Sequence, residues 1–179
     1  MAASARDAFG AYAAARLPVV RRTAYLLCGN WHTAEDLAQA AFIKLYLHWR
    51  RVERSESLDA YVRTTVVRLW LDQTRTSRWR REHLVAVTPD SPALAEDSDD
   101  ITVLGLALDR LTPSQHAVLV LRFWEDLDVR STAAALGVSE GTVKSQTSKA
   151  LVSLRRELAA LGVTGSGLFD VLADKGERS

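Results

Sequence analysis

Four arginines and one tryptophan gather near residue 78 of this 179-residue chain. They are Arg75, Arg78, Trp79, Arg80 and Arg81. A guanidinium binds phosphate through a planar fork of N–H donors, and an indole ring can stack on an unpaired base. Basic side chains interleaved with an aromatic ring therefore predict a nucleic-acid contact. The alternative is a solvated helix end with a core tryptophan, which describes most short charged runs.

A second polar group occupies residues 142–149, where small hydroxyl side chains alternate with lysines. Its members are Thr142, Lys144, Ser145, Gln146, Ser148 and Lys149. Thr142, Ser145 and Lys149 fall on one face of a helix, because residues three and four apart are neighbours there. Small polar donors and lysines in the first half of a helix suit base edges and phosphates in a DNA major groove.

The residues around this group favour a helix-turn-helix. We expect a short helix over residues 129–136, a left-handed turn at Gly137, and a long helix capped by Ser139 that reaches about Leu161. Val138 is expected to pack between the two helices. The alternative is a plain helical hairpin with no role in DNA binding.

A third candidate surface lies on a helix expected to begin with a capping box at Thr33 and to end near His48. Its core face is apolar and consists of Ala34, Leu37, Ala38, Ala41 and Leu45. The opposite face mixes polar and apolar side chains: Asp36, Gln39, Ile43 and Tyr46. A mixed stripe of this kind predicts a surface that docks another protein. The alternative is a helix buried on both sides within its own domain.

A longer helix is expected between Ser57, its cap, and about Arg80. The face opposite its core side presents Thr64, Val67, Arg68, Leu71, Arg75 and Arg78. Pro18 is expected to open or kink a helix that ends at Cys28, and the residues from Thr112 to Gln115 combine a cap, a proline and a glutamine that begin another helix. Since alternating strand patterns are absent, the fold class is predicted to be all-α.

Charge divides the chain into blocks. Residues 1–83 carry 14 basic and 8 acidic side chains, residues 84–104 carry five acids and no base, and residues 105–179 carry nine of each. The acidic strip contains Pro89 and Pro92 and has no helical period, so it reads as a linker, either an ordered loop or a flexible tether. The predicted organisation is two small helical domains, 1–84 and 104–161, with a linker at 85–103 and a tail at 162–179.

The sequence lacks the motifs that usually mark several classes of protein. The single cysteine, Cys28, excludes an internal disulfide and a cysteine zinc site, and the four histidines show no ligand spacing. There is no phosphate-binding glycine loop, so we expect no metal, no cofactor and no enzyme activity. No run of about 18 apolar residues occurs, and the N-terminus lacks a signal peptide pattern, so we expect a cytoplasmic protein without a membrane span.

Three stretches resemble the bacterial RNA polymerase sigma factors. TAEDLAQAAF at residues 33–42 is similar to conserved segment two-two, LTPSQHAVLVLRFWEDL at 111–127 to segment four-one, and GVSEGTVKSQ at 137–146 to the recognition helix of segment four-two. Two helical units joined directly by a linker resemble the extracytoplasmic-function (ECF) group. The run from Val143 to Leu151 is similar to its actinobacterial SigE-type subfamily.

The resemblance implies a factor that binds core RNA polymerase, recognises promoter DNA and initiates transcription. It implies that the clamp helices of the largest polymerase subunit contact Glu35, Asp36, Gln39, Phe42, Ile43 and Tyr46, with the flap as a second polymerase contact. It implies that the −10 element and the opened strand contact a loop at residues 50–56 and the helix that follows, through Thr64, Arg68, Leu71, Arg75, Arg78, Trp79, Arg80 and Arg81. It implies that the −35 element contacts Thr142, Lys144, Ser145, Gln146, Ser148 and Lys149.

Some alternatives stay open from the sequence. Many relatives carry an asparagine where this chain has Arg68, so the sequence leaves open which residues hold flipped −10 bases. The resemblance allows an anti-sigma factor as a further partner. A stand-alone helix-turn-helix regulator would bind a symmetric operator without polymerase, and a pure interaction protein would direct no promoter-specific transcription.

Overall fold

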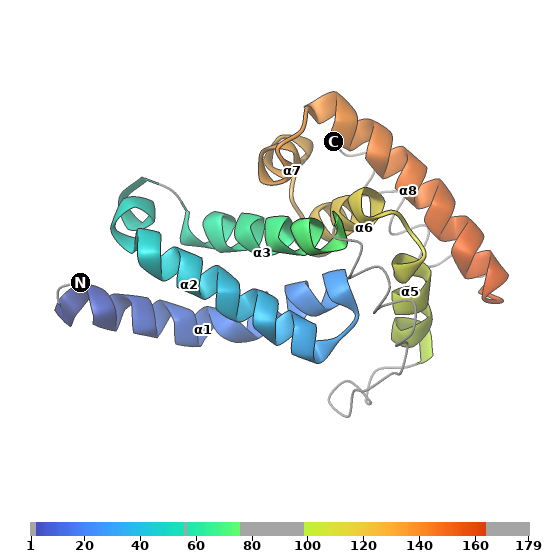
Figure 1. The fold of residues 1–179 in the computed structure, drawn as a ribbon. Helices are drawn as coiled ribbons and strands as arrows, with labels where there is room; N and C mark the ends of the chain where they lie inside the picture. The colour runs from blue at the N-terminus through green and yellow to red at the C-terminus, as the bar shows by residue number, and fades with distance from the viewer. Residues whose placement is uncertain (1–2, 56, 76–98, 164–179) are drawn as a thin grey trace. The chain divides into compact units, whose positions relative to one another are not determined.

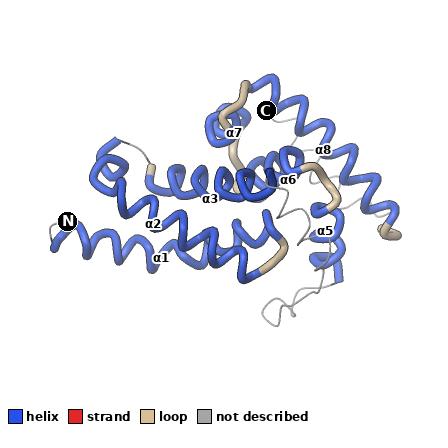
Figure 2. The backbone as a smooth tube through the Cα atoms, viewed as in Figure 1, coloured by secondary structure: helices blue, strands red, loops and turns tan. Residues whose placement is uncertain are grey.

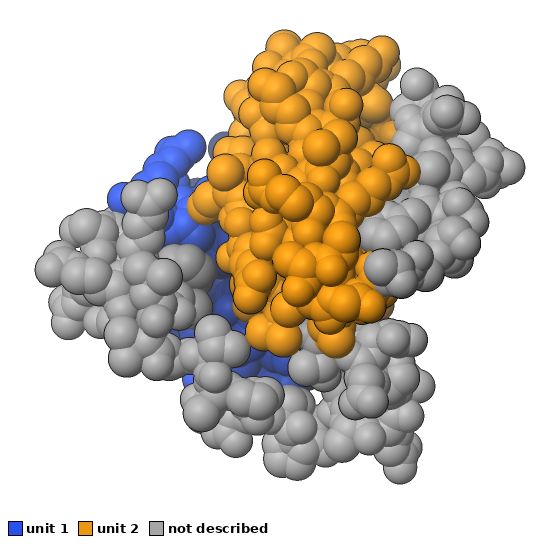
Figure 3. Space-filling view, turned by 90° about the vertical axis from the view of Figure 1, so that its right-hand side faces the viewer, with its two compact units in different colours: residues 1–90 blue, residues 91–179 orange. Residues whose placement is uncertain are grey.

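The computed structural model describes residues 3–55, 57–75 and 99–163 (Figure 1). Within these residues every regular element is helical and none is a strand (Figure 2). The chain divides into two compact units, residues 1–90 and residues 91–179 (Figure 3). The prediction of an all-α fold is confirmed.

The first unit packs three helices, α1 (Ala3–Cys28), α2 (Trp31–Ser55) and α3 (Leu58–Arg75). Ring contacts give the register of the first two, because Phe9 meets Trp49 while Tyr25 stacks on Trp31 at the other end. The helices α1 and α2 are therefore antiparallel. Their core contains large side chains that are at most 2% exposed, among them Leu27, Leu37, Leu45, Val62 and Trp70.

Helix α2 is longer at both ends than the sequence predicted. It begins at Trp31, because the side-chain oxygen of Asn30 accepts a hydrogen bond from the backbone N–H of Thr33 at 3.0 Å. Asn30, and not Thr33, is thus in the capping position. Trp49 and Val52 are 2% and 1% exposed, so they extend the buried face and carry the helix to Ser55. The loop expected at residues 50–56 is therefore wrong for residues 50–55, and residue 56 is outside the described residues.

Helix α1 ends at Cys28 as predicted, and Gly29 follows with a left-handed φ of 66°. The expectation that Pro18 could open this helix is wrong, because Pro18 lies inside it. Packing on both sides of the proline holds the helix together: the rings of Phe9 and Tyr12 contact Trp49 before it, and Ala24 is buried after it.

Helix α3 begins after Ser57, whose hydroxyl accepts from the backbone N–H of Ala60 at 3.4 Å, as predicted. Asp59 then ties α3 to α1. Arg16 donates to both of its carboxylate oxygens at 2.9 and 2.6 Å, and Tyr12 donates to one of them at 2.8 Å. Burial and this carboxylate raise the pKa of Tyr12 above its ordinary value, so the phenol remains a donor.

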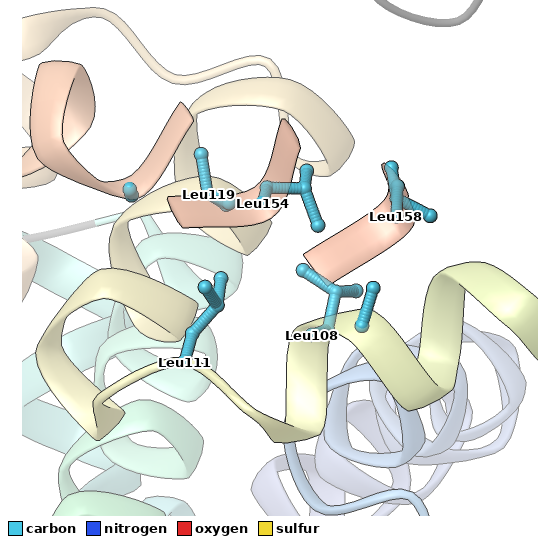
Figure 4. Close-up of a cluster of buried hydrophobic side chains, with 7 residues drawn as sticks. Leu108, Leu111, Leu119, Leu154 and Leu158 are labelled. Carbon is cyan, nitrogen blue, oxygen red and sulfur yellow. The ribbon is translucent and has the colours of Figure 1, made fainter. Parts of the chain in front are cut away.

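The second unit contains α5 (Asp99–Asp109), α6 (Pro113–Leu119), the π-helical turn η1 (Val120–Trp124), α7 (Val129–Leu136) and α8 (Glu140–Ala160). Residues 99–103, expected to lie in the linker, belong to α5. A leucine-rich core joins α5, α6 and α8 (Figure 4), with Leu108, Leu111, Leu119, Leu154 and Leu158 at its centre.

The predicted helix signals of this unit are confirmed. Thr112 and Gln115 form a reciprocal capping box at the start of α6. Gly137 adopts the left-handed conformation with φ 69°, and the hydroxyl of Ser139 accepts from the N–H of Thr142 at 3.1 Å. The expectation for Val138 is wrong, since it is 42% exposed. The space between α7 and α8 is filled instead by Val129, Ala133 and Val143.

Candidate functional site

The exposed face of α2 is the first candidate site. It presents four side chains predicted from the sequence, Asp36, Gln39, Ile43 and Tyr46, and all four are exposed. Ile43 is 61% and Tyr46 37% exposed. Leu47, which the sequence pattern did not single out, is 70% exposed one helical turn after Ile43. Its position four residues from Ile43 was the signal that could have found it.

Two further residues assigned to this face lie differently. Glu35 is half-buried and forms an ion pair with Arg21 of α1. Phe42 is only 7% exposed, and its ring lies 6.4 Å from that of Tyr12, so it belongs to the core and not to the surface. We define the α2 surface by its remaining members, Glu35, Asp36, Gln39, Ile43, Tyr46 and Leu47.

The α2 surface has chemically different ends. Its first turns carry the carboxylates of Glu35 and Asp36, and its later turns carry the apolar side chains of Ile43, Tyr46 and Leu47. Exposed apolar side chains next to charged ones are typical of surfaces that bind other proteins. The arrangement suits a partner with basic groups beside an apolar patch.

The second candidate site is the outer face of α3. Arg68 and Arg75 are exposed, and Thr64 and Leu71 are half-buried. Arg75 lies 3.6 Å from the carboxylate of Asp72 at the helix end. Val67 was predicted to lie on this face, but this is wrong, because Val67 is fully buried in the core. The remaining basic and aromatic residues of the predicted site lie outside the described residues: Arg78, Trp79, Arg80 and Arg81.

The third candidate site is the first half of α8. Five predicted residues are exposed and the sixth, Gln146, is half-buried; the exposed ones are Thr142, Lys144, Ser145, Ser148 and Lys149. The opposite stripe is buried as predicted, since Val143, Ala150 and Leu154 are at most 2% exposed. The Thr142 hydroxyl lies 2.9 Å from that of Ser139, so it also takes part in the helix cap. The face joins two lysines to small donors, which suits phosphates and base edges.

Two other kinds of site are absent from the described residues, a metal centre and a membrane-spanning helix. No three histidine, cysteine, aspartate or glutamate side chains are grouped so that they could hold a metal ion. In the same part of the chain, no helix combines the length and the apolar character needed to cross a membrane. Each of the three candidate sites described above is an outer helix face, on α2, α3 or α8.

Comparison with known proteins gives two family matches. The model of Sigma-70 region 2 matches residues 12–80, and that of Sigma-70 region 4 matches residues 107–156. The first match spans α2 and α3, and the second spans the helix-turn-helix of α7 and α8.

Individual relatives agree with the family matches. The chain is 38% identical to an RNA polymerase sigma-E factor of Streptomyces coelicolor, over 85% of this chain and 86% of the relative. It is 35% identical to the ECF RNA polymerase sigma factor SigE of Mycolicibacterium smegmatis, over 78% of this chain and 57% of the relative.

A solved structure is also similar, the sigma factor RpoE from Bartonella quintana in complex with the anti-sigma factor NepR. Its TM-score is 0.70 and its sequence identity 26%, over 84% of this chain and 96% of the other. Both the sequence and the fold therefore place this chain in one family. The chain belongs to the bacterial RNA polymerase sigma factors of the ECF group, close to the SigE-type members of actinobacteria.

Proposed function

We propose that the three surfaces divide the work of a sigma factor between them: the α2 surface holds core RNA polymerase, the outer face of α3 holds the −10 region, and α8 reads the −35 element. One observation carries this division. The exposed face with apolar and acidic side chains lies on α2, whereas the exposed face with lysines and hydroxyls lies on α8 of the other unit. The first chemistry suits a protein and the second suits DNA.

The α2 surface binds the clamp helices of the largest polymerase subunit in this proposal. Ile43 and Leu47 are exposed at 61% and 70%, which is costly for a surface that stays in water, so a partner that covers them gains apolar burial. The carboxylates of Glu35 and Asp36 pair with basic groups of the partner at the other end. Phe42 supports this surface from the core and does not contact the partner.

The outer face of α3 contacts the −10 element. Arg68 and Arg75 are exposed there and offer guanidinium forks to phosphate. The segment that follows adds Arg78, Trp79, Arg80 and Arg81 as further contacts to the opened strand. An aromatic side chain that stacks on an unpaired base contributes about 1–3 kcal/mol per base, so Trp79 is the residue we assign to trapping the melted strand.

Helix α8 reads the −35 duplex from the major groove. Lys144 and Lys149 supply phosphate contacts, which give affinity that falls with salt. Ser145, Gln146 and Ser148 face base edges, where a good pair of hydrogen bonds discriminates by about 1–3 kcal/mol. The hydroxyl of Thr142 contacts the duplex while its backbone N–H is held by Ser139.

The partners follow from these assignments. Core RNA polymerase is bound through its clamp helices and its flap, and promoter DNA through its two elements. The solved sigma factor from Bartonella quintana is in complex with an anti-sigma factor, and we propose that a protein of that kind binds this chain too. In this proposal the polymerase makes the phosphodiester bonds, and we assign no catalytic step to this chain. Because its partners are RNA polymerase and chromosomal DNA, the proposed location of the chain is the cytoplasm.

Run-off transcription tests the proposal. Purified core polymerase is assayed with and without the full chain on a library of promoter fragments, and transcripts are sequenced to locate their starts. We expect initiation only when the chain is present, at fragments that share −35 and −10 sequences. Binding of the chain to specific DNA in the absence of polymerase, together with no directed initiation, would favour a stand-alone regulator and overturn the proposal.

A further inference from the structure

The aromatic member of the α2 surface, Tyr46, is held by a residue of another helix. The ring centroid of Phe9 on α1 lies 5.1 Å from that of Tyr46, and the two ring planes meet at 72°. Aromatic pairs prefer this edge-to-face arrangement. The first turns of α1 lie beside the later turns of α2 (Figure 1). Tyr46 is 37% exposed, so part of its ring meets solvent while Phe9 contacts another part.

Phe9 is in turn fixed by a buried ring. Its centroid lies 5.4 Å from that of Trp49, and the planes are nearly perpendicular at 89°. Trp49 is 2% exposed and follows Tyr46 by three residues, so both rings are within reach of the same side of α2. Phe9 is half-buried between them. It therefore connects the core of the first unit to the exposed α2 surface.

The helix that carries Phe9 is held in place by bonds of its own. Tyr12, whose ring lies 6.0 Å from that of Trp49, donates to Asp59 of α3 at 2.8 Å. Arg16 donates to both carboxylate oxygens of Asp59 at 2.9 and 2.6 Å. These bonds fasten the first half of α1 to α3. A change of the Phe9 ring therefore removes the support of Tyr46 without releasing the helix.

Helix α1 thus supports the α2 surface at both ends. Arg21 pairs with Glu35 at the acidic end, and Phe9 contacts Tyr46 at the apolar end. A side chain that is already held in the free protein loses less rotamer freedom when a partner covers it, and so it binds more tightly. The contact with Phe9 gives Tyr46 this advantage.

We propose that Phe9 is a positioning residue for polymerase binding: it holds the Tyr46 ring in the orientation in which core RNA polymerase covers it. The inference rests on the proposed function, in which Tyr46 is a polymerase contact. Phe9 acts through Tyr46 and does not itself contact the polymerase.

The test is a double-mutant cycle on the full chain, with the Kd for purified core polymerase as the measurement. Phe9→Leu keeps an apolar side chain but removes the ring, and Phe9→Tyr is the conservative variant that keeps the ring. Each is made alone and together with Tyr46→Ala. Val52→Ala is the matched control, because Val52 is 1% exposed on the same half of α2 and its truncation disturbs the packing from the buried side.

We expect Phe9→Leu to raise the Kd about two- to tenfold when Tyr46 is present, and to leave it unchanged in the Tyr46→Ala background. Phe9→Tyr should bind like the wild type. Val52→Ala should lower the midpoint of urea unfolding and leave the Kd unchanged. In the free chain, the NMR signals of the Tyr46 ring should shift in Phe9→Leu and stay in place in Val52→Ala.

Three results would overturn the inference. They are a wild-type Kd for Phe9→Leu or for Tyr46→Ala, an equal loss from Phe9→Leu with and without the Tyr46 ring, and Tyr46 signals that do not respond to Phe9→Leu. The second result would assign Phe9 to the stability of the fold alone. Failure of the wild-type chain to bind polymerase would instead contradict the proposed function, and the inference with it.

Discussion

The guanidinium of Arg21 on α1 donates a hydrogen bond to the carboxylate of Glu35 on α2. The same guanidinium lies 5.5 Å from the centroid of the Trp31 ring, on which Tyr25 stacks at 4.2 Å. Arg21 and Tyr25 are one turn apart on α1, as Trp31 and Glu35 are on α2. The four side chains thus pack the end of α1 against the start of α2. Through the contact with Arg21 they also fix the position of Glu35 at the acidic end of the α2 surface.

Exchanging the charges of Arg21 and Glu35 separates their effect on the stability of the fold from their effect on polymerase binding. Both side chains are about 40% exposed, at 38% and 43%, so the pair contributes only about 0–1 kcal/mol to stability. We expect the double variant Arg21→Glu, Glu35→Arg to unfold within about 0.5 kcal/mol of the wild type, because the pair is rebuilt in reverse. Its affinity for core polymerase should fall, because a positive charge then stands at the acidic end of the surface.

The measurements are urea unfolding and polymerase binding on the same preparations. The single variants Arg21→Glu and Glu35→Arg serve as controls, since each places two like charges opposite one another. Wild-type binding by the double variant would mean that Glu35 serves only the fold.

Leu45 and Leu47 provide a matched comparison on one helix. Leu45 is completely buried and Leu47 is 70% exposed, two residues further on. Leu45→Ala should lower the free energy of unfolding by about 2–5 kcal/mol through the cavity that it leaves. Leu47→Ala should change that free energy by less than about 0.5 kcal/mol and yet weaken polymerase binding. Chemical unfolding and a polymerase binding assay check the pair, and an unaltered Kd for Leu47→Ala would remove Leu47 from the α2 surface.

Lys149 on α8 is exposed and is assigned to phosphate. We expect Lys149→Ala to weaken −35 binding on all sequences alike and to reduce the slope of log K against log salt by about 0.9, the value for one phosphate contact. Polymerase binding should not change. Footprinting of the promoter complex at several salt concentrations measures the loss of −35 binding and the change in the salt slope. Normal promoter occupancy with an unchanged slope would show that this lysine does not contact the duplex.

The lowered pKa of Asp128 leads us to expect that the second unit loses stability at acid pH. The bond from the Ser131 N–H lowers the pKa of Asp128 below its ordinary value of 3.8. Folding therefore favours the carboxylate, and its stabilising contribution is complete above pH 3.8 and is lost as the pH falls through the lowered value. Glu157, whose pKa is lowered mainly by Arg156, acts in the same direction.

The check is the midpoint of urea unfolding between about pH 5 and pH 2. Asp128→Asn should keep the cap and show a smaller drop in midpoint over this range than the wild type. The same drop in both proteins would mean that the carboxylate of Asp128 contributes nothing to the acid response.

The sequence alone determined the features that depend on neighbouring residues. The caps at Ser57, Thr112 and Ser139 and the left-handed turn at Gly137 were predicted correctly, because each involves atoms at most a few residues apart. The two faces of α2 also followed from helical spacing, and the order of motifs led to the right family. The positions of the site residues on exposed faces were visible in the same spacing, while their roles remain predictions.

The tertiary structure alone decided which side chains a neighbouring helix covers. Phe42 looked like a border residue of the α2 surface, yet the ring of Tyr12 on α1 covers it, while Leu47 in the same helix has no such cover and stays 70% exposed. Packing also keeps α1 continuous across Pro18. The π-helical turn η1 is closed by a hydrogen bond from the guanidinium of Arg122 to the backbone carbonyl of Leu127. Periodicity states that a residue lies on one side of a helix, but burial depends on contacts between residues distant in sequence, which no local pattern contains.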